Sequence, residues 1–332
     1  MKILVTGCYG FIGFNFLNYL NENYKDELQI VGIDSLESSC AKKNHQFSRN
    51  LNNFTFFEDS ILNVENLDIS NVDLIINFAA ETHVDNSIFR PEKFVESNIL
   101  GLTHLLKFAL KQETSNFLHV STDEIYGSRE EGYFKESDNI IEPSSPYSAS
   151  KASAEMICKS FTRTYGLNIN MIRPGNNYGI YQQPEKMIPF SIANLLSNKN
   201  IELYGTGENI RHWLFVDDTA SAVMKIIEIN PENEIYNVGS GHYLSNLELS
   251  KKILSLLNLD ESRLEFVEDR PGHDFRYATD FTKLEKIGWK PVANFDNELS
   301  KIVDWYRDNE KWWREEYNFI VEKTRSKRLN IK

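Results

Sequence analysis

A glycine-rich turn between an apolar strand and a helical pattern constrains the fold of this chain more than any other feature. Residues Lys2–Thr6 are apolar and β-prone, and Gly7, Gly10 and Gly13 follow at intervals of three. Apolar residues then recur at helical spacing through Leu20. This order is typical of a dinucleotide-binding unit, because glycines let the backbone approach a pyrophosphate and the helix N-terminus attracts its negative charge.

A second strand, Leu28–Ile33, ends at Asp34, about 20 residues beyond the turn, where an acidic side chain accepts hydrogen bonds from the adenosine ribose. Ser35 and Glu37 follow, without a cation that would bind a 2′-phosphate. We therefore expect NAD rather than NADP. A turn-forming aspartate is the alternative reading of Asp34.

Further strands alternate with helices along the next part of the chain, and we expect them at residues 54–57, 72–78, 117–120 and 167–172. This alternation predicts an α/β fold, with a Rossmann-like doubly wound parallel sheet. We expect an NAD-binding domain over residues 1–174, to which part of 210–240 returns, and a smaller C-terminal α/β substrate-binding domain over mainly 175–332.

Composition excludes several classes of function. The net charge of −12 disfavours a nucleic-acid partner. Three cysteines without a Cys-x-x-Cys pair disfavour a disulfide framework, and no His-Glu-x-x-His motif suggests a metal site. No apolar run has the length of a membrane span. We expect a soluble cytoplasmic protein without a metal.

Four polar side chains follow the strand at 117–120, in the order Ser121, Thr122, Asp123 and Glu124. The carboxyl ends of strands border the ligand crevice of an open α/β sheet. Adjacent carboxyl groups repel each other, and different surroundings give one an acid role and the other a base role. A helix N-cap or a solvated turn is the alternative.

Tyr147 and Lys151 open the helix that begins at Pro146, and their spacing of four places them on one helix face. A lysine ammonium beside a phenol lowers the pKa of the phenol. A tyrosinate at this position can remove a proton from a substrate hydroxyl. The alternative is a surface tyrosine and lysine, which is common for an isolated Tyr-x-x-x-Lys.

Taken together, these motifs resemble the extended short-chain dehydrogenase/reductase family and, within it, the dTDP-glucose 4,6-dehydratases. The resemblance covers nearly the whole chain. Its carriers are Gly7-x-x-Gly10-x-x-Gly13, Ala79–Asp85, Ser121–Gly127, Ser145–Lys151, Asn176–Gly179, Pro184–Pro189, Ile210-Arg211-x-Trp213 and Asp269–Asp274.

The resemblance implies a homodimer and a three-stage reaction. Tyr147, with Lys151, takes the proton of the glucose 4-hydroxyl as C4 is oxidised, while Thr122 hydrogen-bonds the 4-oxygen. Glu124 then removes the C5 proton and Asp123 protonates the departing C6 hydroxyl, before C6 is reduced. The implied NAD contacts are Gly7, Gly10, Phe11, Ile12, Gly13, Asp34, Ser35, Asp59, Ser60, Ala79, Ala80, Ser97, Tyr147, Lys151 and Asn177. The implied nucleotide-sugar contacts are His83, Thr122, Asn176, Arg211, Asn246, Arg270 and His273.

Two departures from the family pattern leave alternatives open. Arg173-Pro-Gly is closer to the UDP-sugar branches, so UDP-glucose is the alternative substrate. Cys8-Tyr9 replaces small residues inside the glycine turn, and Tyr9 must point away from the pyrophosphate. A related epimerase or decarboxylase is a further alternative, but neither reaction requires Asp123. An inactive NAD-binding regulatory protein is the last alternative, and it would not require Thr122, Asp123, Glu124, Tyr147 and Lys151 together.

Overall fold

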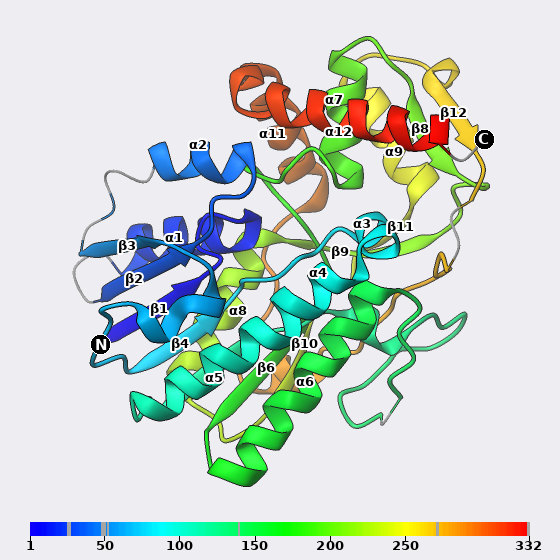
Figure 1. Ribbon diagram of the computed structural model, residues 1–332. Coiled ribbons are helices and arrows are strands. Elements are labelled where there is room, and N and C mark those ends of the chain that lie inside the picture. Colours follow the sequence, from blue (N-terminus) through cyan, green and yellow to red (C-terminus); the bar gives the residue numbers. More distant parts are fainter. Residues whose placement is uncertain (25–27, 48–50, 52, 139, 270–271, 331–332) are drawn as a thin grey trace.

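A seven-stranded parallel sheet lies at the centre of the protein (Figure 1). The computed structural model describes residues 1–24, 28–47, 51, 53–138, 140–269 and 272–330. The strands of the sheet are β1 (Lys2–Thr6), β2 (Gln29–Asp34), β3 (Phe54–Glu58), β4 (Leu74–Asn77), β5 (Asn116–Val120), β6 (Ile169–Pro174) and β10 (Ile235–Val238).

The strand order is β10-β6-β5-β4-β1-β2-β3, so the chain reverses its direction of winding beside β1. The connections after β1 and β4 leave toward opposite sides, which opens a crevice at the carboxyl ends of these strands. The glycine turn follows β1, and the polar turn after β5 lies two strands away. The predicted Rossmann-like α/β fold is confirmed.

Alternate side chains of each strand enter cores on the two faces of the sheet. Ile3 and Val5 pack in the core that also contains residues of α1 (Phe11–Asn23) and α8 (Val216–Ile229). Leu4 faces the other core, which α5 (Leu102–Lys111) and α6 (Pro146–Tyr165) cover. This alternation follows from the period of two in a strand.

The helical segment at residues 91–111 is not regular. It begins with α4 (Pro91–Val95), continues through a π-helical turn at Glu96–Gly101 and ends with α5. Its apolar stripe belongs to the core, because Phe94, Leu105 and Leu106 are buried. π-helical turns are frequent at functional sites, and this one includes Ser97.

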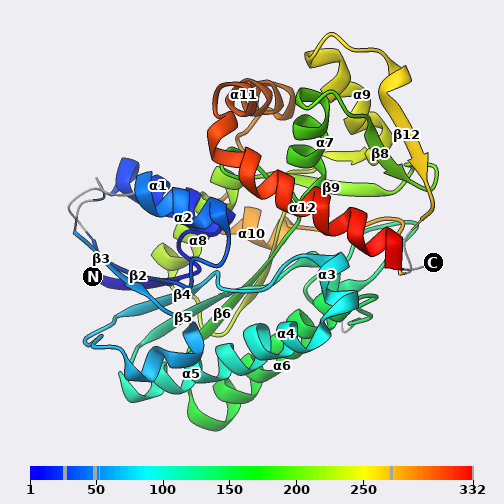
Figure 2. The ribbon, with the colours of Figure 1, turned by 45° about the horizontal axis from the view of Figure 1, so that its top comes forward.

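The C-terminal part forms a second layer above the carboxyl ends of the sheet strands (Figure 2). Its strands are β7 (Asn176–Tyr178), β8 (Ile201–Tyr204), β9 (Ile210–Phe215), β11 (Tyr243–Ser245) and β12 (Leu264–Val267). They form a three-stranded sheet in the order β11-β9-β7 and a two-stranded sheet of β12 and β8. The helices α7 (Met187–Leu196), α9 (Asn246–Leu256), α11 (Phe295–Asp308) and α12 (Glu310–Asn330) pack around a separate apolar core.

The remaining elements are short. They comprise α2 (Ser39–Phe47), α3 (Val84–Phe89), α10 (Thr282–Lys286) and three 3₁₀ helices at Ile61–Asn66, Asp123–Tyr126 and Glu261–Arg263. Among the helices of the described residues, none is long and apolar enough to cross a membrane. The same residues contain no group of three or more His, Cys, Asp or Glu side chains arranged to hold a metal ion.

Candidate active site

The glycine turn packs closely against the end of β4. Gly7 has a φ of +65°, and a Cβ atom there would lie 2.7 Å from the backbone nitrogen of Ala79. At Gly13 a Cβ atom would lie 2.2 Å from the carbonyl oxygen of Gly7. Both positions therefore require glycine, and Ala79 lies directly against the turn.

The N-terminus of α1 fits a bound pyrophosphate. Gly10 is its N-cap and provides no side-chain cap, and the first turn of the helix has no acidic residue. The amide groups of Phe11, Ile12 and Gly13 begin this helix, so their donors and the helix dipole face the turn.

Asp34 forms a turn with Leu36, as in the alternative reading of this residue, and it also binds the backbone of the glycine turn. Its carboxylate accepts hydrogen bonds of 2.9 Å from the backbone amides of Tyr9 and Leu36. Burial raises the pKa of Asp34, and these hydrogen bonds lower it in part. Each carboxylate oxygen has a second lone pair, so a ribose contact remains compatible with this arrangement.

Asp59 and Ser60 form the next turn along this edge. Asp59 accepts from the Ser60 amide at 2.7 Å, and Ser60 caps the 3₁₀ helix that follows. Ser35 is exposed beside Asp34.

Tyr9 points away from the crevice, as expected. Its side chain is 1% exposed and lies against Phe56 and His45, with ring centroids 4.9 and 5.1 Å away. Cys8 is fully buried beside Gly32. The bulky Cys8-Tyr9 pair thus belongs to the core beneath the turn and does not crowd its outer face.

The polar segment after β5 folds into a catalytic turn, defined here as residues 121–126. Thr122 is the N-cap of the 3₁₀ helix Asp123–Tyr126, and its hydroxyl accepts from the Glu124 amide at 3.3 Å. The capping role offered as an alternative therefore coexists with the clustering of polar groups at the strand end.

Asp123 and Glu124 lie in different surroundings. Asp123 is 2% exposed, and its Oδ2 atom has no hydrogen-bond partner in the described part of the chain. Burial and the charge of Glu124 raise the pKa of Asp123 well above its ordinary value, although Arg211 lowers it in part. Glu124 is half-buried. This difference favours a protonated Asp123 beside a carboxylate, as a divided acid and base pair requires.

A capping box positions Tyr147 at the start of α6. Ser145 and Ser148 cap each other's backbone amides, and Pro146 occupies the first helical position. Tyr147 is therefore fixed in the first turn, where the helix dipole favours an anion. Lys151 follows one turn later, and its ammonium donates a 2.7 Å hydrogen bond to the carbonyl of Val120.

The pKa of Tyr147 differs from the sequence expectation. Burial and the negative charge of Glu124 raise it, while a hydrogen bond from Thr122 lowers it in part. Burial lowers the pKa of Lys151 to about 8, although Glu155 opposes the shift. The expectation that Lys151 lowers the pKa of Tyr147 below its usual range was wrong for the protein alone, because both side chains are withdrawn from water.

Arg211, which lies close enough to Asp123 to lower its pKa in part, is linked to Asn246 through Asn209 and Asp274. The Asn246 amide donates to the carbonyl of Asn209 at 3.0 Å, and the Asn209 side chain donates to the carbonyl of Asp274 at 3.2 Å. Arg211 Nη2 donates to the same Asp274 carbonyl at 3.1 Å, and its guanidinium lies 4.6 Å from the ring centroid of Tyr277.

The other expected ligand contacts are more dispersed. His83 caps α3 and accepts from the Asn86 amide at 3.2 Å. His273 pairs with Asp269 at 2.6 Å. Asn176 Oδ1 is buried without a partner among the described residues, whereas the Asn177 side chain bonds Thr219 and the Gly175 carbonyl. Arg270 lies outside the described residues.

Asn98 is a connecting residue that sequence reasoning missed. Its amide bonds both backbone groups of Glu81 and also the Ser150 hydroxyl, at distances of 2.8 to 3.0 Å. It therefore ties the segment after β4 to α6, next to Ser97. The signal was an asparagine inside an apolar helical stripe, where a polar residue requires partners.

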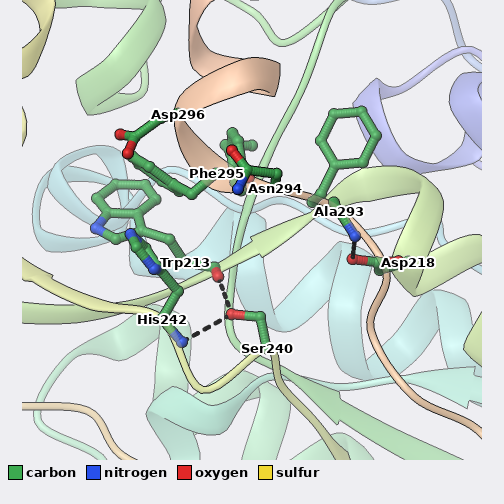
Figure 3. A pocket seen from close by; sticks show the side chains of 10 residues that line it. Trp213, Asp218, Ser240, His242, Ala293, Asn294, Phe295 and Asp296 are labelled. Atoms are coloured by element: carbon green, nitrogen blue, oxygen red, sulfur yellow. Dashed lines mark hydrogen bonds between the residues drawn. The ribbon is translucent and has the colours of Figure 1, made fainter.

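A separate pocket lies in the C-terminal part, and Figure 3 shows the side chains that line it. Trp213, His242 and Phe295 form one wall, and Asp218 accepts from the Ala293 amide at 3.2 Å. None of the expected catalytic residues lines this pocket. The candidate catalytic residues lie instead on the catalytic turn and α6.

Comparisons with known proteins agree with this geometry. A family model described as GDP-mannose 4,6 dehydratase matches residues 4–302. The low-salt glycan biosynthesis protein Agl12 of Haloferax volcanii is 41% identical, over 92% of this chain and 98% of its own length. A dTDP-glucose 4,6-dehydratase of Streptomyces niveus is 38% identical, over 94% of this chain and 95% of its own.

A solved structure extends the similarity to three dimensions. DesIV, a dTDP-glucose 4,6-dehydratase from Streptomyces venezuelae solved with NAD bound, superposes with a TM-score of 0.91 at 38% identity. The match covers 95% of this chain and 100% of that one. With a family model over most of its length and relatives near 40% identity, the chain belongs to the GDP-mannose 4,6-dehydratase family.

Proposed function

We propose that this protein is a dTDP-glucose 4,6-dehydratase, a hydro-lyase that converts dTDP-glucose to dTDP-4-keto-6-deoxyglucose and water. The observation that carries this proposal is the unequal carboxyl pair of Asp123 and Glu124, next to Tyr147 and Lys151. Elimination across C5 and C6 requires one base and one acid, and epimerisation or decarboxylation does not require an acid at C6. The named dTDP-glucose 4,6-dehydratases among its relatives support the same substrate.

The chain's own residues divide the work between α6 and the catalytic turn. Tyr147 takes the proton of the 4-hydroxyl once the positive charges of Lys151 and of bound NAD offset the burial that raises its pKa in the protein alone, and Thr122 holds the 4-oxygen. A ketone at C4 acidifies the C5 hydrogen, which Glu124 removes. Burial and the charge of Glu124 raise the pKa of Asp123, which favours the protonated form that donates to the departing C6 hydroxyl.

NAD is the cofactor that these residues fit, and when bound it would accept hydride from C4 and supply hydride to C6. C5 regains a proton as C6 is reduced, which completes the 4-keto-6-deoxy product. The outer face of the glycine turn, the uncapped N-terminus of α1 and Asp34 would hold its pyrophosphate and ribose. Asp59 and Ser60 border the adenine side, and Ala79, Ala80, Ser97 and Asn177 complete the proposed contacts. Because the cofactor is regenerated in each cycle, turnover needs no external reductant.

The nucleotide sugar would bind between the sheet and the C-terminal part. We assign NAD binding mainly to residues 1–174 and sugar-nucleotide binding mainly to 175–332. The buried unpartnered Oδ1 of Asn176 and the convergence of Arg211 with Asn246 support this division. His83, Thr122, Arg270 and His273 complete the proposed contacts.

The proposed preference for thymine over uracil rests on the relatives named as dTDP-glucose 4,6-dehydratases, to which a trifunctional UDP-glucose 4,6-dehydratase of Arabidopsis thaliana, also 38% identical, is an exception. Arg173 is 2% exposed and is engaged by Glu155 and Tyr126, so it is not placed to read a base. The form of the Arg173-Pro-Gly segment therefore does not favour UDP-glucose.

A direct test is to incubate the purified protein with dTDP-glucose and UDP-glucose separately, without added reductant, and to determine product masses. We expect dTDP-glucose to lose one water at the higher rate. A faster reaction with UDP-glucose would show that the substrate is the uracil nucleotide. If neither sugar loses water although NAD is bound, the proposed dehydratase activity is wrong.

We also propose a cytoplasmic homodimer. Exposed apolar side chains gather on α3, α4, the π-helical turn and α6, namely Ile88, Phe89, Val95, Leu100 and Met156. α3 and α4 pack against α6, so these residues belong to one side of the sheet (Figures 1 and 2). An apolar surface of this kind is typical of an interface between protein chains. Three free, buried cysteines are compatible with a reducing compartment.

A further inference from the structure

A fully buried ion pair lies beneath the catalytic turn. Arg173 on β6 donates to Glu155 on α6 through Nε at 2.9 Å and Nη2 at 2.5 Å, and the two residues are 2% and 0% exposed. Removing two charges from water is costly, and a buried pair is often no more stabilising than apolar residues of the same size. Its two-pronged geometry instead fixes the distance and angle between α6 and β6.

The ion pair extends to the last residue of the catalytic turn. Arg173 Nη1 donates to the Tyr126 hydroxyl at 2.6 Å, and that hydroxyl donates to Oδ1 of Asn237 at 2.9 Å. The Tyr126 ring stacks on Phe134 with a centroid distance of 4.8 Å and an angle of 5°. The phenol is therefore fixed at its oxygen and on its ring face.

Asn237 is itself fixed. Its Nδ2 group donates to the carbonyls of Phe134 and Asp280, at 3.1 and 3.0 Å. Both hydrogen atoms of the amide are thereby used, so Oδ1 is directed at Tyr126. The side chains of Glu155, Arg173, Tyr126 and Asn237 are buried, so their hydrogen bonds do not exchange with water.

Helix α6 thus holds both ends of the catalytic turn. Lys151 binds the carbonyl of Val120, the residue before the turn. Glu155 lies one helical turn later and, through Arg173, holds Tyr126 at the far end. Asp123 and Glu124 lie between these two attachments, and Tyr147 is on the same helix.

We propose that Glu155, Arg173 and Tyr126 are positioning residues for the elimination step. They set the place of Asp123 and Glu124 relative to a sugar that Tyr147 has already engaged. This inference rests on the proposed dehydratase function. Oxidation at C4 depends on Tyr147 and Lys151, whose attachment at Val120 is independent of Tyr126. Loosening the far end should therefore slow elimination more than oxidation.

Tyr126→Phe tests this proposal because it retains the ring and the ion pair but removes the hydroxyl. Tyr317→Phe is the matched control: Tyr317 is 1% exposed and donates at 2.7 Å to Oδ1 of Asn194, within the C-terminal core. With dTDP-glucose, rapid-mixing absorbance follows cofactor reduction, and quenched samples follow loss of water. In Tyr126→Phe we expect elimination to fall about 10²-fold while oxidation stays near the wild-type rate, so that reduced cofactor accumulates.

The control and the wild type separate the possible failures. Tyr317→Phe should show wild-type rates for both steps at a similar melting temperature. Equal slowing of both steps in Tyr126→Phe, or no slowing, would overturn the positioning role. A wild-type protein that neither reduces its cofactor nor loses water from the sugar would overturn the proposed function instead.

A second variant covers the case in which Tyr126→Phe does not fold. Glu155→Gln combined with Arg173→Gln removes both charges together and so avoids leaving one buried charge unpaired. Because Glu155 also raises the pKa of Lys151, both steps are measured across the pH range, and we expect the loss of elimination to exceed the loss of oxidation at every pH. If the folded double variant has the wild-type ratio of elimination rate to oxidation rate, the proposal is contradicted.

Discussion

The ammonium of Lys151 donates a 2.7 Å hydrogen bond to the carbonyl oxygen of Val120, the last residue before the catalytic turn. Burial lowers the pKa of Lys151 to about 8, so the positive charge is lost as the pH rises through that value. We expect the rate of C4 oxidation to fall above about pH 8 as the charge disappears. Lys151→Met should lower the oxidation rate at neutral pH about 10²-fold and remove this pH-dependent fall. An unchanged rate in single-turnover absorbance would exclude a role for Lys151 in oxidation.

Tyr147→Phe and Glu124→Gln should stop the reaction at different stages. The first removes the base for the 4-hydroxyl, so cofactor reduction should be lost. The second removes the base for C5, so the cofactor should be reduced but water should not leave. Absorbance of reduced cofactor and product mass distinguish these outcomes. Full turnover by Glu124→Gln would assign the C5 base to another residue.

Asp123→Asn should make the protein more stable at neutral pH while it abolishes elimination. The folded-state pKa of Asp123 is raised by burial and by Glu124, whereas an unfolded aspartate titrates near pH 4. The contribution of the protonated Asp123 side chain to the free energy of unfolding is fully present below about pH 4 and is lost as the pH rises through the raised pKa. Asparagine carries no such charge. Unfolding in urea across this range should show a gain for the variant that grows with pH, and a constant difference would contradict the raised pKa.

Gly7→Ala should impair both stability and cofactor retention, because the new methyl group would lie 2.7 Å from the Ala79 nitrogen. Gly166→Ala is a suitable control, since Gly166 has a φ of +73° and nothing lies within 4 Å of its added Cβ. The control should lose about 1 kcal/mol from its backbone conformation alone and should retain its cofactor. Urea unfolding and the amount of NAD released on denaturation measure the difference. Equal losses in the two variants would show that close packing at Gly7 is unimportant.

Met156→Glu should weaken the proposed dimer, because it places a charge in the exposed apolar surface of α6. Val292→Glu is the control, since Val292 is 88% exposed and lies outside this surface. Sedimentation velocity should give a monomer for the first variant and a dimer for the second. A monomeric wild-type protein would remove the basis of the dimer proposal.

Much of the sheet could be predicted because its strands are short and apolar and are followed by glycine or acidic residues. β1 has the predicted bounds, and the strands expected at 54–57, 72–78, 117–120 and 167–172 correspond to β3, β4, β5 and β6. The π-helical turn at Glu96–Gly101 could not be predicted, because no residue type in this segment marks an inserted residue.

The types of candidate residues could be predicted, but their connections could not. Tyr147 and Lys151 share a helix face because of their spacing. The partner of Lys151 is a backbone carbonyl on another strand, and Asp34 binds backbone amides of the glycine turn. No side-chain pattern encodes such contacts. The pKa of Tyr147 also depends on its depth in the fold, which its spacing from Lys151 does not determine.

We expect the hydride removed from C4 of the sugar to be returned to C6 of the same molecule. The most direct test is to supply dTDP-glucose with deuterium at C4, without external reductant, and to locate the label by NMR. We predict a 4-keto-6-deoxy product with the deuterium at C6. A dehydrated product without the label at C6, or a label that remains at C4, would contradict the account.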